Sequence, residues 1–299
     1  DLALRKFIVA VSKDENIEDN EYLKNEDGSY KRAPVVDTSK LNTKDDEGNL
    51  ITTATYNHTK EPVLVQRNDI VVYMLRVYNE GDMDGYAAEI KDHLPPHLEF
   101  VDSEFNKEYG WEVSEDGRTV TTTYLKDSLI KKPEQVGEAK TTGFVPEYDE
   151  DGNIVGGKSA LWYEYSYELD YKEVPIMCKV KDTAPRNENI TNIADITKYE
   201  DEDHNPVEDR DSQENNVELP KDEDLPGYKD DETGEYIPGQ QDDDDFEKVI
   251  VKKFDLALRK WVTQAIVTDK KGTTVTNTGH QPYDDPEGIV KVELDKKNL

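Results

Sequence analysis

DIVVYMLRVYN, residues 69–79, is rich in β-branched and aromatic residues and predicts a buried β-strand. The NEGDMDG stretch that follows is typical of a turn, and YAAEIKD at residues 86–92 predicts a second strand. LPPHL ends that strand, because proline lacks the N–H group that a sheet ladder needs. This strand, turn and strand are typical of an antiparallel sheet.

Similar strand signals occur along most of the chain, and long helical periodicity is absent. Residues 13–60 are polar and turn-rich, which predicts loops with short strands, and residues 126–158 predict a long excursion. Further strands are predicted at 1–12, 111–125 (a hairpin turning at SEDG), 161–171, 173–180 and 189–198. Many short strands of this kind predict an all-β protein, an immunoglobulin-like β-sandwich.

The opening of the chain is repeated near its end. DLALRKFIV begins at Asp1 and DLALRKWVT begins at Asp255, a separation of 255 − 1 = 254 residues. We therefore predict a tandem repeat, with a sandwich module at 1–200, an acidic linker at 201–254 and a truncated second copy at 255–299. Arrays of extracellular modules usually form stalks, fibres or adhesins, which favours a structural role.

Composition excludes several classes of protein. Asp plus Glu number 68 against 37 Lys plus Arg, and the net charge of −31 disfavours nucleic acid and anionic membranes as partners. No apolar run approaches the length of a membrane span, about 18 residues. The single cysteine, Cys178, leaves metal sites or other crosslinks to stabilise a secreted module. Neither a zinc-type His/Cys spacing nor a phosphate loop is present, so we predict that the chain is not a turnover enzyme.

Three polar residues fall on the apolar faces of predicted strands: Lys6, Asp92 and Asn192. Their same-face neighbours are Leu2, Leu4 and Ile8 for the first, Ala88 and Ile90 for the second, and Ile190, Ala194 and Ile196 for the third. Burying an amine, a carboxyl and a carboxamide separately is unfavourable by several kcal/mol for an unpaired ion. We therefore expect the three side chains to be buried together.

Together, these groups have the means to form a covalent bond. Desolvation favours the uncharged forms of an amine and a carboxyl, so the amine becomes a nucleophile. The neutral acid can hydrogen-bond the carboxamide and shuttle protons. Attack then expels ammonia and leaves an isopeptide bond, in a single-turnover reaction that proximity accelerates.

The first strand with its lysine, EIKDHLPPHLEFV and ITNIADIT resemble the isopeptide-forming domains of Gram-positive fimbriae and surface adhesins. YMLRVYNEGDMDGYAAEIKDHLPPHLEFV also resembles the repeats of large clostridial surface proteins, with their pattern N-x-G … D-x-LP-x-x-L. The resemblance covers roughly residues 1–200. It implies that Lys6 is the amine, Asn192 the amide donor and Asp92 the catalytic acid. Because LPPHL and the long loop at 13–60 depart from the pattern, Glu99 stays an alternative acid.

In the second copy, Lys260 takes the position of Lys6, on a face with Leu256, Leu258 and Val262. Its acid and amide partners are expected beyond Leu299, because the first module extends to Asn192 before both are supplied.

Two acidic strings, at residues 200–216 and 242–245, bracket the predicted linker. Calcium binds carboxylate and amide oxygens, which Asp209, Asp211, Asn215 and Asp243 can supply. The strings DRDS-x-x-NN and DDDD resemble calcium-binding linkers of clostridial and staphylococcal surface repeats. The alternative is a solvated linker whose like charges repel one another.

These observations predict a structural repeat of an extracellular stalk, fibre or adhesin of a Gram-positive bacterium, at the cell surface or anchored to the cell wall and stabilised by a Lys–Asn isopeptide bond. Its partners would be neighbouring repeats. The alternative is an adhesin module that binds a host protein or glycan, for which WYEYSY at 162–167 is a candidate surface. A third possibility is an accessory domain attached to an enzyme.

Overall fold

The computed structural model describes residues 1–45, 47–149, 154–210, 212, 217, 242–253, 258, 260–269 and 272–277. They belong to two units, Asp1–Lys252 and Lys253–Leu299. In the second unit, β15 (Gln264–Asp269) and β16 (Gly272–Asn277) pair as an antiparallel hairpin. The first unit contains the predicted isopeptide residues.

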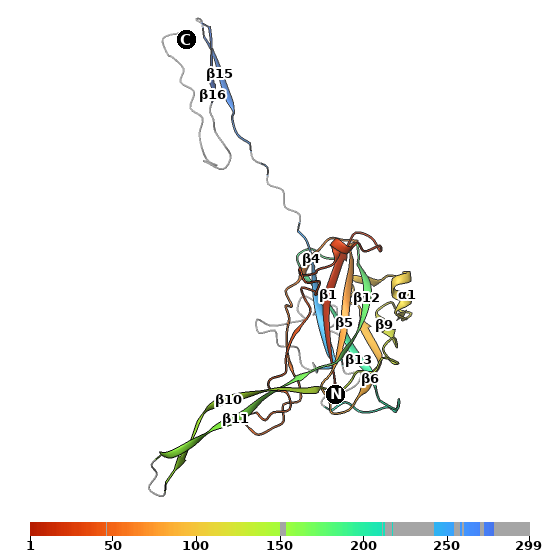
Figure 1. The fold of residues 1–299 in the computed structure, drawn as a ribbon. Coiled ribbons are helices and arrows are strands. Elements are labelled where there is room, and N and C mark those ends of the chain that lie inside the picture. Colours follow the sequence, from red (N-terminus) through yellow and green to blue (C-terminus); the bar gives the residue numbers. More distant parts are fainter. Residues whose placement is uncertain are drawn as a thin grey trace. The chain divides into compact units, whose positions relative to one another are not determined.

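Two β-sheets build the body of the first unit (Figure 1). The four-stranded sheet has the order β1-β5-β12-β7 and is antiparallel throughout. Its strands are β1 (Leu2–Ser12), β5 (Ile70–Asn79), β12 (Tyr171–Val180) and β7 (Leu98–Phe100). Because β1 is an edge strand of this sheet, its outer side is open to other elements.

The six-stranded sheet has the order β4-β14-β13-β6-β9-β8. The pairing of β14 with β4 is parallel, and the other pairings are antiparallel. Its strands are β4 (Val63–Val65), β14 (Asp244–Val251), β13 (Asn189–Asp201), β6 (Gly85–His93), β9 (Thr119–Thr122) and β8 (Glu112–Val113).

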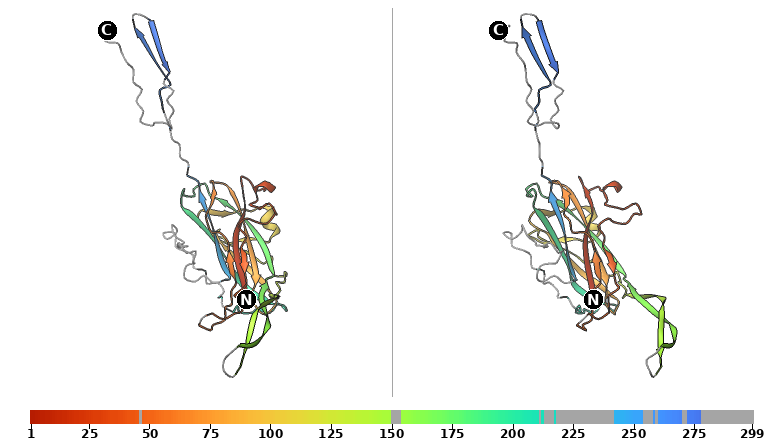
Figure 2. Two further views of the ribbon diagram at one scale, coloured as in Figure 1. Left: turned by 60° about the vertical axis from the view of Figure 1, so that its left-hand side comes forward. Right: turned by 90° about the vertical axis from the view of Figure 1, so that its left-hand side faces the viewer.

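Smaller elements lie between these strands. A 3-10 turn (Asp19–Glu21) and the paired strands β2 (Val35–Asp37) and β3 (Thr55–Asn57) occupy the segment predicted as loops with short strands. The helix α1 (Glu104–Glu108) begins after Ser103, whose hydroxyl accepts the Asn106 N–H. The excursion predicted at 126–158 contains β10 (Glu134–Tyr148) and the start of β11 (Ile154–Glu168), which pair as a separate two-stranded sheet that leaves the sandwich (Figure 2). Most of the strand predicted at 161–171 therefore belongs to this hairpin.

The hydrophobic core lies between the two sheets and follows the period of two that the strands impose. In β5 the buried core side chains are Val71, Tyr73, Leu75 and Val77, and in β12 they are Val174, Ile176, Cys178 and Val180. The facing sheet contributes Ile90, Leu94, Val120, Ile190, Ala194, Ile196, Val249 and Val251. The prediction of an all-β, immunoglobulin-like sandwich is therefore confirmed.

The predicted boundary of the first module is wrong. We expected a linker from residue 201, but the first unit extends to Lys252, and β14 pairs with both β13 and β4. The DDDD string misled the interpretation, because aspartate is depleted in strands. In the structure, Asp243, Asp244 and Asp245 are buried at the start of β14. The tandem repeat stays a prediction.

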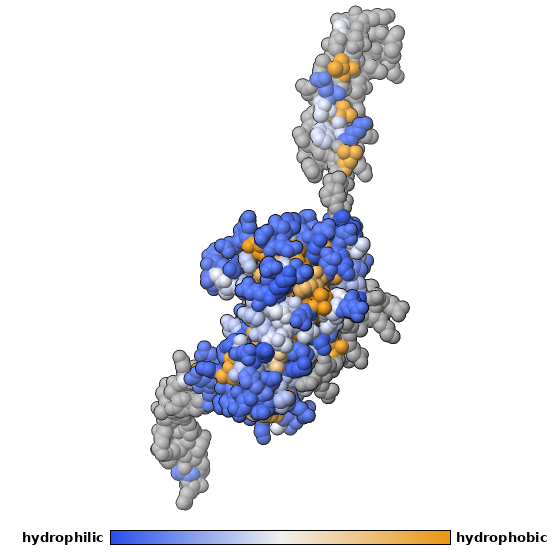
Figure 3. All heavy atoms as spheres, turned by 90° about the vertical axis from the view of Figure 1, so that its right-hand side faces the viewer, coloured by the Kyte–Doolittle hydropathy of each residue, from blue (hydrophilic) through white to orange (hydrophobic). Residues whose placement is uncertain are grey.

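The surface is consistent with the charged composition. On the face drawn in Figure 3, hydrophilic residues dominate the first unit, and hydrophobic ones are confined to patches among them. Within the described part of the chain, no helix has the length and apolarity that crossing a membrane requires.

Candidate functional site

Lys6 lies in the middle of β1 and points into the sandwich. It is opposite Leu75 of β5 and has no exposed surface. Leu4 and Ile8, two residues before and after it, belong to the main hydrophobic core. A register shift follows between Ile8 and Ala10, so the alternation that orients Lys6 holds only for the first part of the strand.

Asp92 meets Lys6 from the other sheet. It lies on β6, opposite Ala194 of β13 and Val120 of β9, and it is also fully buried. The Nζ atom of Lys6 donates a hydrogen bond to Oδ2 of Asp92. This contact joins the two sheets through the core, as the sequence predicts.

Asn192 lies on β13, two residues before Ala194. Since Ala194 is opposite Asp92, Asn192 is a diagonal neighbour of Asp92 on the same face of the sheet. The carboxamide is fully buried, and neither its Oδ1 nor its Nδ2 has a hydrogen-bond partner among the described residues. Oδ1 of Asp92 is likewise buried without a partner there. Buried polar atoms are normally hydrogen-bonded, so these three atoms need an explanation.

Tyr73 and Cys178 complete the surroundings of the pair. The Tyr73 ring centroid is 5.0 Å from Nζ of Lys6, a cation–π distance. Burial, reinforced by Cys178 and Asp92, raises the pKa of the Tyr73 phenol well above its ordinary value. Burial and Asp92 do the same for the pKa of the Cys178 thiol, so both side chains stay uncharged. Sequence analysis did not single out Tyr73, although it shares an inward face with Val71 and Leu75.

Glu99, the alternative acid, lies elsewhere. It is on β7, opposite Lys179 of β12, and its side chain is 45% exposed. Its carboxylate is 3.5 Å from Nζ of Lys179. The structure therefore brings Asp92, and not Glu99, to Lys6.

Carboxylates of β14 accept hydrogen bonds from main-chain N–H groups at the open edge of β1. Asp245 accepts the main-chain N–H of Lys6 at 2.7 Å, and Glu247 accepts that of Ile8 at 3.4 Å. Two cations from the long 13–60 segment neutralise these buried acids. Arg32 binds Glu247 with two hydrogen bonds, of 2.9 and 2.7 Å, and Lys60 binds Asp245 at 2.8 Å.

At Asp245, burial and the neighbouring cations have opposite effects on the pKa of the carboxyl. Burial alone would raise the pKa of Asp245, but Lys60 and His58 hold it below its ordinary value. Sequence analysis missed Arg32 and Lys60, because nothing in a polar, turn-rich segment marks a cation that will be buried.

Of the four predicted calcium ligands, the structure describes Asp209 and Asp243. Asp209 accepts the Leu2 N–H at 2.9 Å. Asp243 is buried in the first unit, where its carboxylate accepts the Tyr199 hydroxyl. Burial, reinforced by Asp242, raises the pKa of Asp243 to about 7. Asp211 and Asn215 lie outside the described residues. Placing Asp243 in a linker was wrong, because β14 is a strand of the sandwich.

Lys260 differs from Lys6 in its setting. It is exposed and lies outside the described strands of the second unit. Leu258, expected on the same buried face, is 91% exposed. The described part of the second unit therefore does not repeat the environment of Lys6.

The chain has no match among protein-family models or curated proteins. Its interpretation accordingly rests on geometry. A buried amine in contact with a buried carboxyl, with a buried unpartnered carboxamide beside that carboxyl, provides the nucleophile, proton carrier and acyl group of amide formation.

Proposed function

We propose that this chain is a structural module of a bacterial cell-surface stalk, fibre or adhesin, stabilised by an autocatalytic isopeptide bond between Lys6 and Asn192. One observation carries the proposal: Lys6 and Asp92 are in contact at the centre of the core, and the fully buried carboxamide of Asn192, diagonal to Asp92 on the same sheet, has no hydrogen-bond partner among the described residues. A merely structural ion pair would not account for the buried, unsatisfied amide.

The first step is a proton transfer within the Lys6–Asp92 pair. The hydrogen bond from Nζ to Oδ2 provides the path along which an ammonium passes its proton to a carboxylate. The product is a neutral amine beside a neutral acid. The proposed reaction needs this step, because only the uncharged amine has the lone pair that attacks a carbonyl carbon.

The second step forms the bond. The Lys6 amine attacks Cγ of Asn192, and the protonated Asp92 donates a hydrogen bond to the carbonyl oxygen, on which negative charge develops. Asp92 then gives its proton to the departing amino group and takes one from the attacking nitrogen. The C–N bond of the carboxamide breaks, ammonia leaves, and Asp92 ends protonated, as it entered this second step. No turnover follows, because both reactants are parts of the chain.

The bond would join opposite sheets of the sandwich. Lys6 belongs to β1 and Asn192 to β13, so the crosslink closes 192 − 6 = 186 residues. Tension that enters through β1 would then pass directly to β13 without loading β5, β6 or β12. This property suits a stalk module that must resist force. The second DLALRK sequence at Asp255 supports assembly with neighbouring repeats of the same kind.

Intact mass tests the proposal directly. The folded protein should weigh about 17 Da less than its sequence, the mass of one ammonia released on amide formation. Digestion should yield a branched peptide that contains both Lys6 and Asn192. Asp92→Asn and Asn192→Ala should each restore the missing mass.

Glu89→Gln is the matched control, because Glu89 is on the same strand as Asp92 but bonds Lys198 and Thr197 instead. This variant should keep the crosslink. A full sequence mass for the folded parent protein would refute the proposal. Circular dichroism of the Asp92→Asn protein would show that its restored mass belongs to a folded chain.

A further inference from the structure

Three carboxylates converge at one end of the first unit: Asp1, Glu80 and Asp242. One oxygen from each lies within 4.8 Å of the other two. They come from the residue before β1, the turn after β5 and the segment that leads into β14. The cluster therefore ties together segments that are far apart in the sequence.

Two of the three carboxylates point unpartnered oxygens into buried space. Glu80 is fully buried; its Oε1 accepts the Ala54 N–H at 2.9 Å and the Tyr56 hydroxyl, while Oε2 has no partner among the described residues. The side chain of Asp1 is 1% exposed, and its Oδ1 is also without a described partner. Both oxygens are thus available as ligands, and both are desolvated.

Two arginines lie near the cluster. Arg210 pairs with Asp1 through Oδ2, while Oδ1 of Asp1 has no partner among the described residues. The Arg5 guanidinium stacks on Tyr56, 4.0 Å from the ring centroid, and donates hydrogen bonds to the main-chain carbonyls of Leu4 and Asp242.

Asp242 adds a third carboxylate, which accepts the hydroxyls of Thr53 at 3.1 Å and Ser212 at 2.6 Å. The closeness of these carboxylates affects the pKa of Glu80. Burial and the charge of Asp242 raise the pKa of its carboxyl to about 7.

We propose that Asp1, Glu80 and Asp242 form a binding site for a hard divalent cation, with calcium as the preferred ion. Ligands of one calcium ion lie 2.3–2.6 Å from it, so two of them are separated by up to about 5 Å, which the cluster satisfies. The donors are all oxygens, which disfavours zinc and copper. Magnesium usually keeps several waters and binds through one or two carboxylates, whereas calcium takes more oxygen ligands, so three carboxylates favour calcium.

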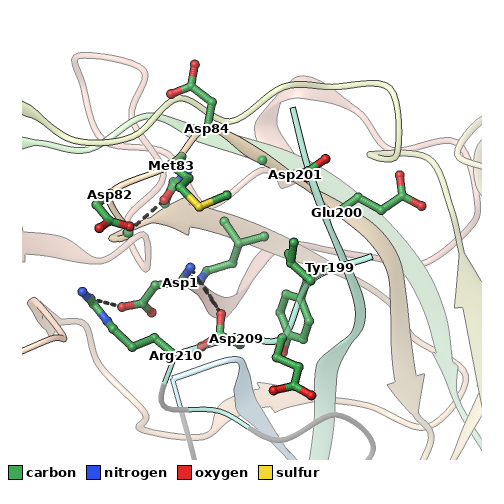
Figure 4. Close-up of a pocket in the computed structure, with 15 residues that line it drawn as sticks. Asp1, Asp82, Met83, Asp84, Tyr199, Glu200, Asp201, Asp209 and Arg210 are labelled. Carbon is green, nitrogen blue, oxygen red and sulfur yellow. Dashed lines mark hydrogen bonds and ion pairs between the residues drawn. The ribbon is translucent and has the colours of Figure 1, made fainter. Parts of the chain in front are cut away.

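A pocket adjoins the cluster at Asp1 and would give the ion a route and room for water ligands. Asp1 lies in its wall, with its carboxylate turned toward Arg210 (Figure 4). The lining also includes Asp82, Asp84, Glu200 and Asp201. Their negative charge would concentrate cations at the entrance. This site differs from the predicted joint, because it lies within the first unit and uses Asp242 where the joint used Asp243.

The test compares Glu80→Gln with Asp82→Asn in the full chain, in chelator and in calcium. Glutamine keeps the Oε1 acceptor for Ala54 and Tyr56 but removes the charge that a cation needs. Asp82 lies in the same turn and lines the same pocket but is exposed, so its variant is a matched control for charge.

In the parent protein, calcium at about 100 times its dissociation constant should raise the melting temperature by about 5–10 °C. Asp82→Asn should keep this shift and Glu80→Gln should lose it. In chelator, Glu80→Gln should melt no lower than the parent, because it relieves repulsion. Lost binding would therefore lower the melting temperature of Glu80→Gln below that of the parent in calcium only. A general loss of stability would lower it in chelator as well.

Terbium gives a second readout that does not depend on stability. Bound beside Tyr56, it should show tyrosine-sensitised emission that calcium displaces and that Glu80→Gln abolishes. Melting that is unaffected by calcium in the parent would overturn the proposal. An equal loss of response in Glu80→Gln and Asp82→Asn, or terbium emission that survives Glu80→Gln, would also overturn it.

Discussion

Asp92 and Glu80 are both fully buried carboxyls, but their neighbours are opposite in kind. Asp92 contacts the amine of Lys6 and lies beside the carboxamide of Asn192. Glu80 faces two further carboxylates, those of Asp1 and Asp242. The first group has its compensating partner inside the core, whereas the second must obtain a proton or a metal ion from solution.

The contrast shows two ways in which an acidic chain can bury acids. Where a cation is built into the core, proton transfer or bond formation removes the charge, and solution conditions then matter little. Where acids gather without enough cations, the local structure becomes sensitive to pH and to divalent ions. The following experiments test whether the two regions separate in this way, beginning with the largest expected effect.

Lys6→Met should cause the largest loss of stability. It removes the crosslink, worth about 5 kcal/mol by analogy with a disulfide that closes a loop of this size. It also leaves Asp92 as an unpaired buried charge, which destabilises by a further 3–5 kcal/mol or so. Denaturant unfolding of the parent and the variant measures the sum.

The double variant Lys6→Met/Asp92→Leu separates these contributions. Replacing both partners with apolar side chains should recover the part that is due to the unpaired charge but not the part that is due to the crosslink. A double variant as stable as the parent would show that no covalent bond contributes.

The stability contributed by the buried acids Glu80 and Asp243 should instead depend on pH. Glu80 and Asp243 have pKa values of about 7 in the folded protein, above their ordinary values of 4.5 and 3.8. The folded state therefore binds protons more tightly, and its stability should fall as pH rises from about 5 through 7. The expected slope is about 1.4 kcal/mol per pH unit for each group.

Urea unfolding in chelator at a series of pH values measures this slope. Glu80→Gln should make it shallower, while Asp82→Asn, which changes an exposed carboxyl, should leave it unchanged. Stability that is constant or rising between pH 5 and 7 in the parent would contradict the assignment.

Glu99→Gln should have the smallest effect. The half-exposed pair of Glu99 with Lys179 contributes at most about 1 kcal/mol, because water screens it. Intact mass should still fall short by one ammonia, since Glu99 does not contact Lys6. Loss of the crosslink in this variant would reassign the acid.

Much of the fold was predictable, because period-two alternation reports directly on strands with one buried face. The strands around Lys6, Asp92 and Asn192 appear where the sequence places them, and all three side chains are buried. Their order along the faces suffices to predict the contact between Lys6 and Asp92. The same alternation also places Tyr73 on the inward face of its strand, with Val71 and Leu75.

The acidic end was not predictable in the same way. Alternation shows which side of a strand is buried, but not whether a distant loop will supply a counter-ion. Glu247 is buried only because Arg32, 215 residues earlier in the sequence, reaches it. Glu80 lies in a turn, where no periodicity indicates burial. Four consecutive aspartates therefore suggested a linker, when three of them are buried and the last two begin a strand of the sandwich.

The position of β14 beside β1 determines the order in which the molecule can be completed during synthesis. One edge of β1 finds its neighbour β5 once the chain has been made as far as Asn79, but the N–H of Leu4 bonds the carbonyl of Asp242, 238 residues later. Such distant contacts slow folding, because a long loop must be ordered before they form. During synthesis, Lys6 therefore lies on a sheet whose facing sheet is incomplete until β13 and β14 have been made. The earliest strand of this unit is thus among the last to be enclosed.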